Sequence, residues 1–194
     1  MRLKVVVILA LLGLGSVACA LVRRHAAAHA TNAAQNTIAE LNPQLVRFTD
    51  YRKWKLVNPV PELMDPVSAI ACDYVHAHQS PHANKYVSVY VNEVGREAML
   101  TQQKPQFPIG SIIVKEKLGT KTSTAPELLT AMVKRETGYD PNNGDWEYLT
   151  LNGAATEIMT SGKLTDCQSC HSLYKHTDYI TRTYLPLEVV KNLK

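Results

Sequence analysis

The most constraining feature of this chain lies near its C-terminal end, in the run Cys167-Gln168-Ser169-Cys170-His171. Two cysteines separated by two residues and followed at once by histidine form the attachment motif of a c-type haem. This spacing lets both sulfurs bond the vinyl groups on one haem edge and carries the histidine under the iron as an axial ligand. The sequence therefore predicts one covalently bound haem c, held from the C-terminal end of the fold.

Two other uses of a cysteine pair agree less well with the rest of the chain. A structural zinc site needs a second pair of ligands at similar spacing, whereas Cys19 and Cys72 each stand alone. A dithiol redox pair does not require His171. Cys72 is expected to pack in the core, because pairing with Cys19 would require the N-terminal segment to be retained.

The N-terminal segment is typical of an export signal. Two basic residues precede an apolar run over residues 5–14, and small residues follow. We expect a signal peptide over residues 1–20, with cleavage as late as residue 30 as an alternative. Lipidation at Cys19, or retention of the segment as an uncleaved anchor, would instead tether the protein to a membrane. Export predicts a periplasmic protein, which agrees with a c-type haem because this haem is attached outside the cytoplasm.

Charge and length limit the class of protein further. Without residues 1–20 the chain keeps 19 basic against 17 acidic side chains, a net charge of about +2. This near balance argues against nucleic acid as a partner. The 194 residues are enough for one domain with a substantial core. We expect a linker over residues 21–36 and a haem domain over residues 37–194.

The middle of the chain is predicted to form strands. Residues 85–92 and 111–118 are rich in β-branched and aromatic side chains that alternate along the segment. Asn92 is expected to cap a short helix that extends to Met99. Another helix is expected over residues 65–78, where Asp and Pro stand at the start.

Two further segments are interpreted as a β-hairpin. Residues 128–136 and 145–151 flank a dense cluster of turn residues at 139–144. A helix that begins near Thr124 is the alternative for the first segment. Residues 154–162 are expected to form a loop or a short helix.

The C-terminal part is predicted to be helical around the cysteine motif. Thr165 or Asp166 is expected to cap the haem-bearing helix, and a last helix or turn is expected over residues 178–184, ended by Pro186. The whole pattern predicts an α+β fold. It consists of an antiparallel β-sheet with packed helices and a C-terminal helix that carries the haem, and it is not a four-helix bundle.

The position of the motif also limits the sixth iron ligand. Only 23 residues follow His171, and none is methionine. His176 is too near to reach the opposite haem face easily and is expected to be exposed. Upstream methionines are expected to pack in the core; they are Met64, Met99, Met132 and Met159. We therefore expect a five-coordinate iron, which binds small ligands or does chemistry, whereas a six-coordinate iron mainly transfers electrons.

An ordered set of motifs is more specific than the cysteine pair. The set comprises Tyr51-x-x-Trp54, Val89-Tyr90-Val91-Asn92, the stretch from Phe107 to Glu116, the stretch from Gly144 to Tyr148, and the cysteine motif with Asp178-Tyr179. In this order the chain resembles the cytochrome P-460 family and its relative cytochrome c′-beta, from residue 51 to about residue 180. The helical cytochrome c′ also has a C-terminal motif, but the predicted strands disfavour it.

The resemblance implies a homodimer with the haem between the sheet and the C-terminal helix. The namesake enzymes oxidise hydroxylamine, with nitric oxide as an intermediate or ligand, and carry a lysine bonded to a haem meso carbon. Lys115 is the candidate for this cross-link, Lys117 is the alternative, and Lys104 is a weaker one. The plainer interpretation of all three is a solvated lysine at a sheet edge. Without a cross-link the protein is expected to bind nitric oxide or carbon monoxide without turnover.

The resemblance also implies a carboxylate about seven residues after the haem histidine, where Asp178 stands. A carboxylate near the distal ligand acts as a proton relay when hydroxylamine is oxidised. The alternative is that Asp178 only caps the final helix. The expected function is thus hydroxylamine oxidation or nitric oxide chemistry with a soluble cytochrome c as redox partner. Gas binding without turnover and simple electron transfer remain as the competing hypotheses.

Overall fold

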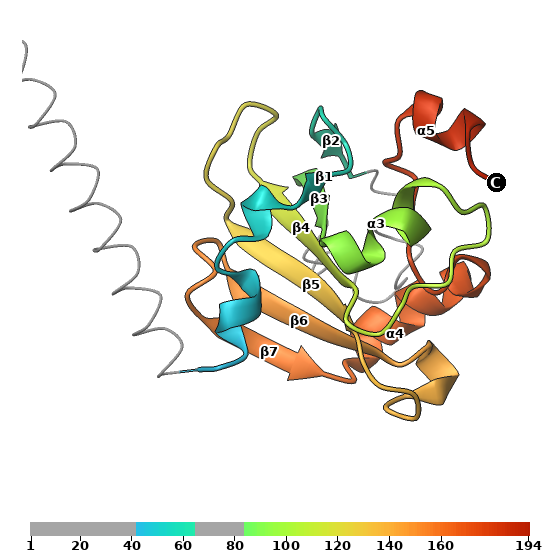
Figure 1. The fold of residues 1–194 in the computed structure, drawn as a ribbon. Helices are drawn as coiled ribbons and strands as arrows, with labels where there is room; N and C mark the ends of the chain where they lie inside the picture. Colours follow the sequence, from blue (N-terminus) through green and yellow to red (C-terminus); the bar gives the residue numbers. More distant parts are fainter. Residues whose placement is uncertain (1–41, 65–83) are drawn as a thin grey trace, which may run out of the picture. The chain divides into compact units, whose positions relative to one another are not determined.

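An antiparallel sheet of seven strands organises the second of two compact units, residues 47–194 (Figure 1). The structure is a computed structural model and describes residues 42–64 and 84–194. The strands are β1 (Lys55–Leu56), β2 (Glu62–Leu63), β3 (Tyr86–Val91), β4 (Ile112–Leu118), β5 (Leu128–Lys134), β6 (Trp146–Asn152) and β7 (Ile158–Gly162). Their order is β1-β3-β4-β5-β6-β7, and β2 also pairs with β3.

Short helices connect and flank these strands. They are η1 (Leu45–Phe48), η2 (Tyr51–Lys53), α3 (Glu93–Leu100), η3 (Pro141–Asn143), α4 (Thr165–His171), η4 (Ser172–Thr177) and α5 (Leu187–Lys191). Across residues 42–64 and 84–194, none of the helices is long and apolar enough to cross a membrane. The expected signal peptide, the linker and the helix over residues 65–78 lie outside the described residues.

The register of the strands defines the face of the sheet that carries the site. Lys115 pairs with Thr130, which in turn pairs with Thr150. Because alternate side chains point to the same side of a strand, one face collects a continuous set of residues, which we call the site face. Its members around the site are Ile113, Lys115, Lys117, Thr130, Met132, Lys134, Trp146, Tyr148 and Thr150. Helix α4 lies against this face, since the rings of Tyr148 and His171 are 5.3 Å apart.

The hydrophobic core lies mainly on the site face. Trp146 and Ile113 from the sheet pack with Ile180 and Tyr184 from the C-terminal segment, and all four are at most 2% exposed. Burial of each large apolar side chain contributes about 1.5–3 kcal/mol, so this cluster holds the C-terminal segment on the sheet. Helix α4 thereby gains a fixed position relative to the strands.

The opposite face of the sheet carries buried carboxylates that are paired. The Tyr51 hydroxyl donates to Glu116 at 2.7 Å, and the Arg52 Nε atom donates to the same oxygen at 2.6 Å. On β6, Glu147 accepts from Arg135 at 2.8 Å. A buried charge is tolerated when it is paired and hydrogen-bonded. These contacts therefore hold η2 against the face of the sheet opposite the site.

Most of the expected elements are confirmed. Strands β3 and β4 lie where alternation predicted them, and β5 and β6 form the expected antiparallel hairpin rather than a helix. The Asn92 side chain accepts a hydrogen bond from the Gly95 backbone N–H at 3.1 Å, and this caps α3 as expected. The fold is thus α+β and not a helical bundle.

Two local expectations are wrong. Residues 158–162 form strand β7 instead of a loop or short helix; this strand is largely exposed, so no apolar alternation marked it. Helix α4 has Leu164 at its N-cap position, with no side-chain cap. Residues 178–184 contain turns instead of a helix, which agrees with the second of the two expected forms, and Asp178 and Tyr179 have left-handed φ angles of 51° and 65°. A further helix, α5, begins after Pro186 and was not expected.

Candidate haem site

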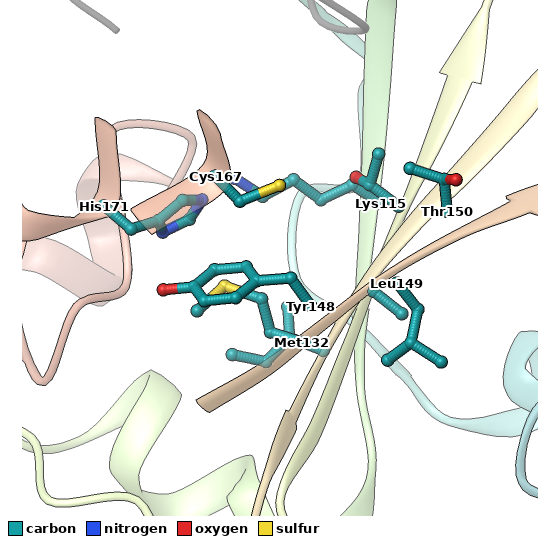
Figure 2. A pocket seen from close by; sticks show the side chains of 10 residues that line it. Lys115, Met132, Tyr148, Leu149, Thr150, Cys167 and His171 are labelled. Carbon is teal, nitrogen blue, oxygen red and sulfur yellow. The ribbon is translucent and has the colours of Figure 1, made fainter. Parts of the chain in front are cut away.

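A pocket lies between α4 and the site face of the sheet (Figure 2). Its empty space, about 420 Å³, includes open solvent at its mouth. Its lining residues come from β4, β5, β6 and α4: Ile113, Lys115, Thr130, Ala131, Met132, Tyr148, Leu149, Thr150, Cys167 and His171. The structure thus brings together a cysteine and the histidine of the motif with the preferred candidate lysine.

Helix α4 explains why the motif residues share one surface. Cys167 precedes Cys170 by three positions and His171 by four, and residues at these spacings are neighbours on a helix. Cys167 is half-buried at the pocket, and burial raises the pKa of its thiol to about 11. Cys170 is disulfide-bonded. A thioether at Cys170 therefore requires reduction of that disulfide first.

His171 is held with one particular nitrogen protonated. The residue is 8% exposed, and its Nδ1 atom lies 2.7 Å from the carbonyl oxygen of Tyr179. A carbonyl oxygen only accepts hydrogen bonds, so Nδ1 carries the proton and Nε2 keeps its lone pair. Metal-binding histidines are typically oriented in this way, by an N–H that donates to a carbonyl or a carboxylate.

The electrostatic surroundings keep this imidazole neutral. Burial lowers the pKa of His171 to about 4, and the positive charge of Lys115 acts in the same direction. The hydrogen bond to Tyr179 opposes this shift without reversing it. Because a histidine ligates iron in its neutral form, the ring is ready to coordinate near neutral pH.

The two candidate lysines on β4 are buried, so their interpretation as solvated edge residues is wrong. Lys115 is 6% exposed and lines the pocket, with its Nζ atom 4.9 Å from the centre of the Tyr184 ring. Burial lowers the pKa of Lys115 to about 8. Lys117 shares the site face but does not line the pocket; burial and the charge of Lys115 lower its pKa. Lys104 is exposed and lies outside the sheet.

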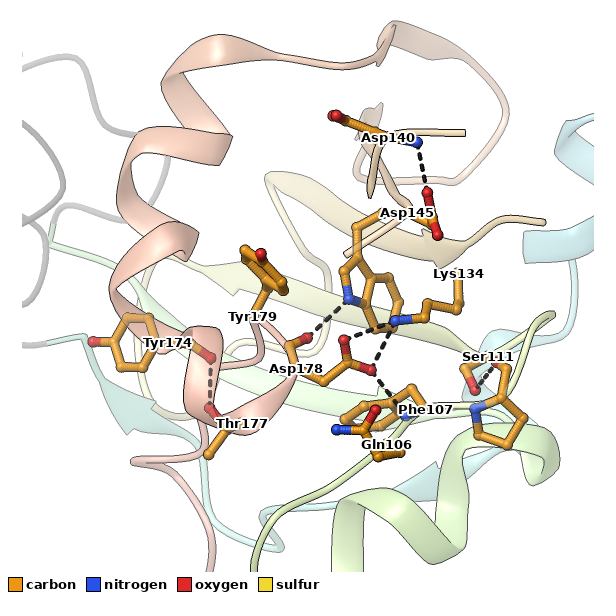
Figure 3. Close-up of polar contacts among 12 residues, drawn as sticks. Gln106, Phe107, Ser111, Lys134, Asp140, Asp145, Tyr174, Thr177, Asp178 and Tyr179 are labelled. Atoms are coloured by element: carbon orange, nitrogen blue, oxygen red, sulfur yellow. Dashed lines mark hydrogen bonds and ion pairs between the residues drawn. The ribbon is translucent and has the colours of Figure 1, made fainter. Parts of the chain in front are cut away.

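Asp178 is buried but does not line the pocket (Figure 3). Its carboxylate accepts from the Lys134 Nζ atom at 2.7 and 2.8 Å and from the Phe107 backbone N–H at 2.9 Å. It ends η4 in a left-handed conformation, so it does not cap a following helix. The proton-relay role of Asp178 stays a prediction.

The methionines and the last histidine fall into different environments. Met132 lines the pocket, whereas Met99 is fully buried in the core. Met159 is 57% exposed on β7, so its expected core position is wrong. His176 is exposed, as expected. Met132 is therefore the methionine that the described structure places at the site.

Several residues of the site were not predicted from the sequence. The hydroxyl groups of Tyr148 and Tyr184 are buried without a hydrogen-bond partner among the described residues. The sequence singled out Tyr148 only as part of a motif, and it gave no sign that the Tyr179 carbonyl would bind His171. Buried, unpartnered hydroxyl groups beside an apolar pocket are consistent with a bound group that carries polar atoms.

These residues fit a haem better than a metal ion held by protein ligands alone. No cluster of three or more His, Cys, Asp or Glu side chains suited to a metal occurs within residues 42–64 and 84–194. A haem needs only one protein nitrogen and a largely apolar wall, and the pocket offers both: His171 Nε2 and the side chains of Ile113 and Met132.

Comparison with known proteins agrees with this geometry. The sequence model of the family described as Cytochrome P460 matches residues 48–182, which is most of the chain. This range contains all the strands and the cysteine motif. None of the curated proteins matches the chain. The family implies a haem cofactor, and the chain belongs to the cytochrome P460 family.

Proposed function

We propose that this protein is a periplasmic, mono-haem c-type cytochrome that oxidises hydroxylamine or reacts with nitric oxide. The observation that carries the proposal is the hydrogen bond from His171 Nδ1 to the Tyr179 carbonyl, which directs an unprotonated Nε2 to a pocket that Cys167 also lines. Cys167 and Cys170 are the proposed thioether residues, and His171 is the proposed axial ligand.

Each part of the pocket has a defined task in this proposal. The Tyr179 carbonyl fixes the tautomer and orientation of His171, while Ile113 and Met132 supply an apolar wall that excludes water. A haem held there by Cys167, Cys170 and His171 would supply redox chemistry toward a small nitrogen ligand. The position opposite His171 is proposed to stay open to such a ligand.

Lys115 is the proposed residue for the haem cross-link, with Lys117 as the alternative. Lys115 lines the same pocket as Cys167 and His171, and Lys117 does not. Because burial lowers the pKa of Lys115 to about 8, a useful fraction of its amine is neutral, and hence nucleophilic, near neutral pH.

A specific observation favours gas binding without turnover as the second candidate. Oxidation of hydroxylamine requires a base that removes protons near the bound ligand. Among the described residues that line the pocket there is no Asp or Glu, and the carboxylate of Asp178 is engaged by Lys134. The third candidate, electron transfer, rests on Met132, whose thioether could provide a sixth ligand.

The mass and the spectrum of the purified holoprotein test the proposal. We expect the denatured protein to have the mass of the chain without its signal peptide plus one haem, and the ferrous protein to show the red-shifted absorption band of a lysine cross-link. An ordinary c-type spectrum would remove the cross-link from the proposal. A mass without haem under denaturing conditions would remove covalent attachment.

Turnover and partners need separate measurements. Steady-state oxidation of hydroxylamine with a soluble cytochrome c as electron acceptor distinguishes the enzyme from the gas-binding protein. Rapid binding of carbon monoxide by the ferrous protein contradicts the electron carrier. Cell fractionation tests the periplasmic location, and light scattering tests the proposed homodimer.

A further inference from the structure

Two consecutive residues behind His171 adopt a conformation that is unusual for L-amino acids. Asp178 and Tyr179 have φ angles of 51° and 65°, and neither is glycine. We call this pair the left-handed corner. Such residues persist only where the surrounding structure holds them firmly, and they concentrate at functional sites.

Contacts from several segments hold Asp178 in this corner (Figure 3). Its carboxylate accepts from Lys134 Nζ at 2.7 and 2.8 Å and from the Phe107 N–H at 2.9 Å. Its carbonyl oxygen accepts from the indole N–H of Trp146 at 2.8 Å. Lys134 is itself placed over the Trp146 ring, 4.9 Å from its centre. Thus β5, β6 and the loop before β4 all converge on one residue.

Tyr179, the second residue of the corner, is held by contacts of its own. Its hydroxyl donates to the carbonyl of Asn142 at 2.9 Å, and its N–H donates to the carbonyl of Tyr174 at 2.8 Å. Gly144 packs so closely that an added Cβ atom would lie 2.5 Å from the tyrosine ring. The Tyr179 carbonyl oxygen therefore has a fixed position, and at 2.7 Å it accepts the hydrogen bond of His171 Nδ1.

The corner lies on the side of His171 that faces away from the proposed iron position. The two nitrogens of an imidazole point in different directions, and the corner engages Nδ1 while Nε2 serves as the ligand atom. An N–H that donates to a well-placed acceptor makes the ligating nitrogen more basic. The corner can thus alter the electron density that the ligand gives to the iron.

We propose that Asp178 is a positioning residue for the axial ligand: with Lys134 it holds the left-handed corner, so that the Tyr179 carbonyl accepts from His171 Nδ1 and sets the basicity of Nε2. This inference depends on the proposed ligation of iron by His171. It gives the Asp178 carboxylate a role on the His171 side of the haem instead of a proton-relay role on the distal side.

Asp178→Asn in the haem-loaded protein is the direct test. The amide keeps an acceptor for Phe107 but loses the charge that holds Lys134. We expect a lower iron–histidine stretching frequency in the ferrous resonance Raman spectrum and a higher midpoint potential. If the site's preference for ferric over ferrous iron weakens tenfold, the midpoint potential rises by ~59 mV for a one-electron couple.

Glu147→Gln is the matched control. Glu147 is also a buried carboxylate, 4% exposed, and it accepts from Arg135 at 2.8 Å, but it lies on the opposite face of the sheet. This variant is expected to lose stability without a change in stretching frequency or potential. Lys134→Met and Lys134→Arg form a second pair. Lys134→Met is expected to shift the stretching frequency and the midpoint potential as Asp178→Asn does. Lys134→Arg keeps the positive charge and is expected to leave both values close to those of the wild type.

The outcomes separate the possible roles. Wild-type frequency and potential in Asp178→Asn, together with a loss of stability like that of Glu147→Gln, would overturn the proposal. Loss of one pKa from the pH–rate profile at unchanged potential would instead assign Asp178 as a proton relay. If Asp178→Asn does not retain haem, the Lys134 pair decides by the same spectroscopic criteria. A wild-type protein without an iron–histidine stretch would contradict the proposed function itself.

Discussion

The Nδ1 atom of His171 and the carbonyl oxygen of Tyr179 lie 2.7 Å apart, although eight positions separate the two residues in the chain. This hydrogen bond connects the end of α4 to the left-handed corner and leaves Nε2 unprotonated. It makes His171 a preorganised ligand, since the ring does not have to find its orientation when it binds iron.

His171→Gly is expected to remove the axial ligand while the cysteines still retain the haem. The iron–histidine signature should disappear from the ferrous spectrum and return when millimolar imidazole enters the vacated space. Absorption and resonance Raman spectra measure both effects. His176→Gly is the control, because His176 is exposed in the following segment and should leave the spectrum unchanged. An unchanged spectrum in His171→Gly would show that another group ligates the iron.

Lys115→Met is expected to stabilise the folded chain at neutral pH. The measurement uses protein produced without haem, so that no cross-link forms. Burial lowers the pKa of Lys115 from 10.5 in the unfolded chain to about 8 in the folded one. Below pH 8 both states are protonated and the full cost of burying the ammonium is present. Between pH 8 and 10.5 only the unfolded state binds the proton, so the stability of the wild type rises with pH.

The gain from Lys115→Met should therefore be about 2–3 kcal/mol at pH 7 and should shrink towards zero near pH 10.5. Urea unfolding at several pH values measures it. Lys104→Met is the control, since Lys104 is exposed and its replacement should not stabilise the chain. A destabilised Lys115→Met protein at pH 7 would show that the ammonium has a compensating partner in the folded chain.

Met132→Leu tests the coordination number. Met132 lines the pocket, so its sulfur is the described thioether best placed to compete with an external ligand. With a five-coordinate iron, we expect unchanged carbon monoxide binding and a stability cost below about 1.5 kcal/mol, because the two side chains have similar volumes. Met99→Leu, in the core away from the pocket, is the matched control. Faster carbon monoxide binding in Met132→Leu alone would indicate that Met132 ligates the iron.

Gly144→Ala is expected to destabilise the protein by about 2–4 kcal/mol, because a left-handed backbone and a close contact act together. Gly144 has a φ of 67°, and its added Cβ would lie 2.5 Å from the Tyr179 ring. Gly138→Ala is the control: its φ is 95°, but nothing lies within 4 Å of the added atom, so only the backbone cost of about 1–2 kcal/mol should remain. Urea unfolding measures both, and equal losses would contradict the role of the close contact.

The cysteine motif, the long strands and the hairpin could be predicted because each depends on neighbours in the chain. The three-and-four spacing of Cys167, Cys170 and His171 is a property of a helical turn, and the alternation in residues 111–118 is a property of a strand. The ordered motifs then identified the family, since they sample separated parts of the same fold. Strand β7 was missed because an exposed edge strand carries no apolar alternation.

The sequence by itself thus determined that the histidine and the cysteines would share one short helix near the end of a β-rich chain. Only the tertiary structure decided that Lys115 is buried beside them, because its exposure depends on what covers the site face. The tertiary structure also decided the partner of His171. The Tyr179 carbonyl reaches Nδ1 only because Lys134, Trp146 and Phe107, distant in sequence, hold the left-handed corner in place. Such contacts depend on how strands pair and pack, and no local pattern of residue types encodes them.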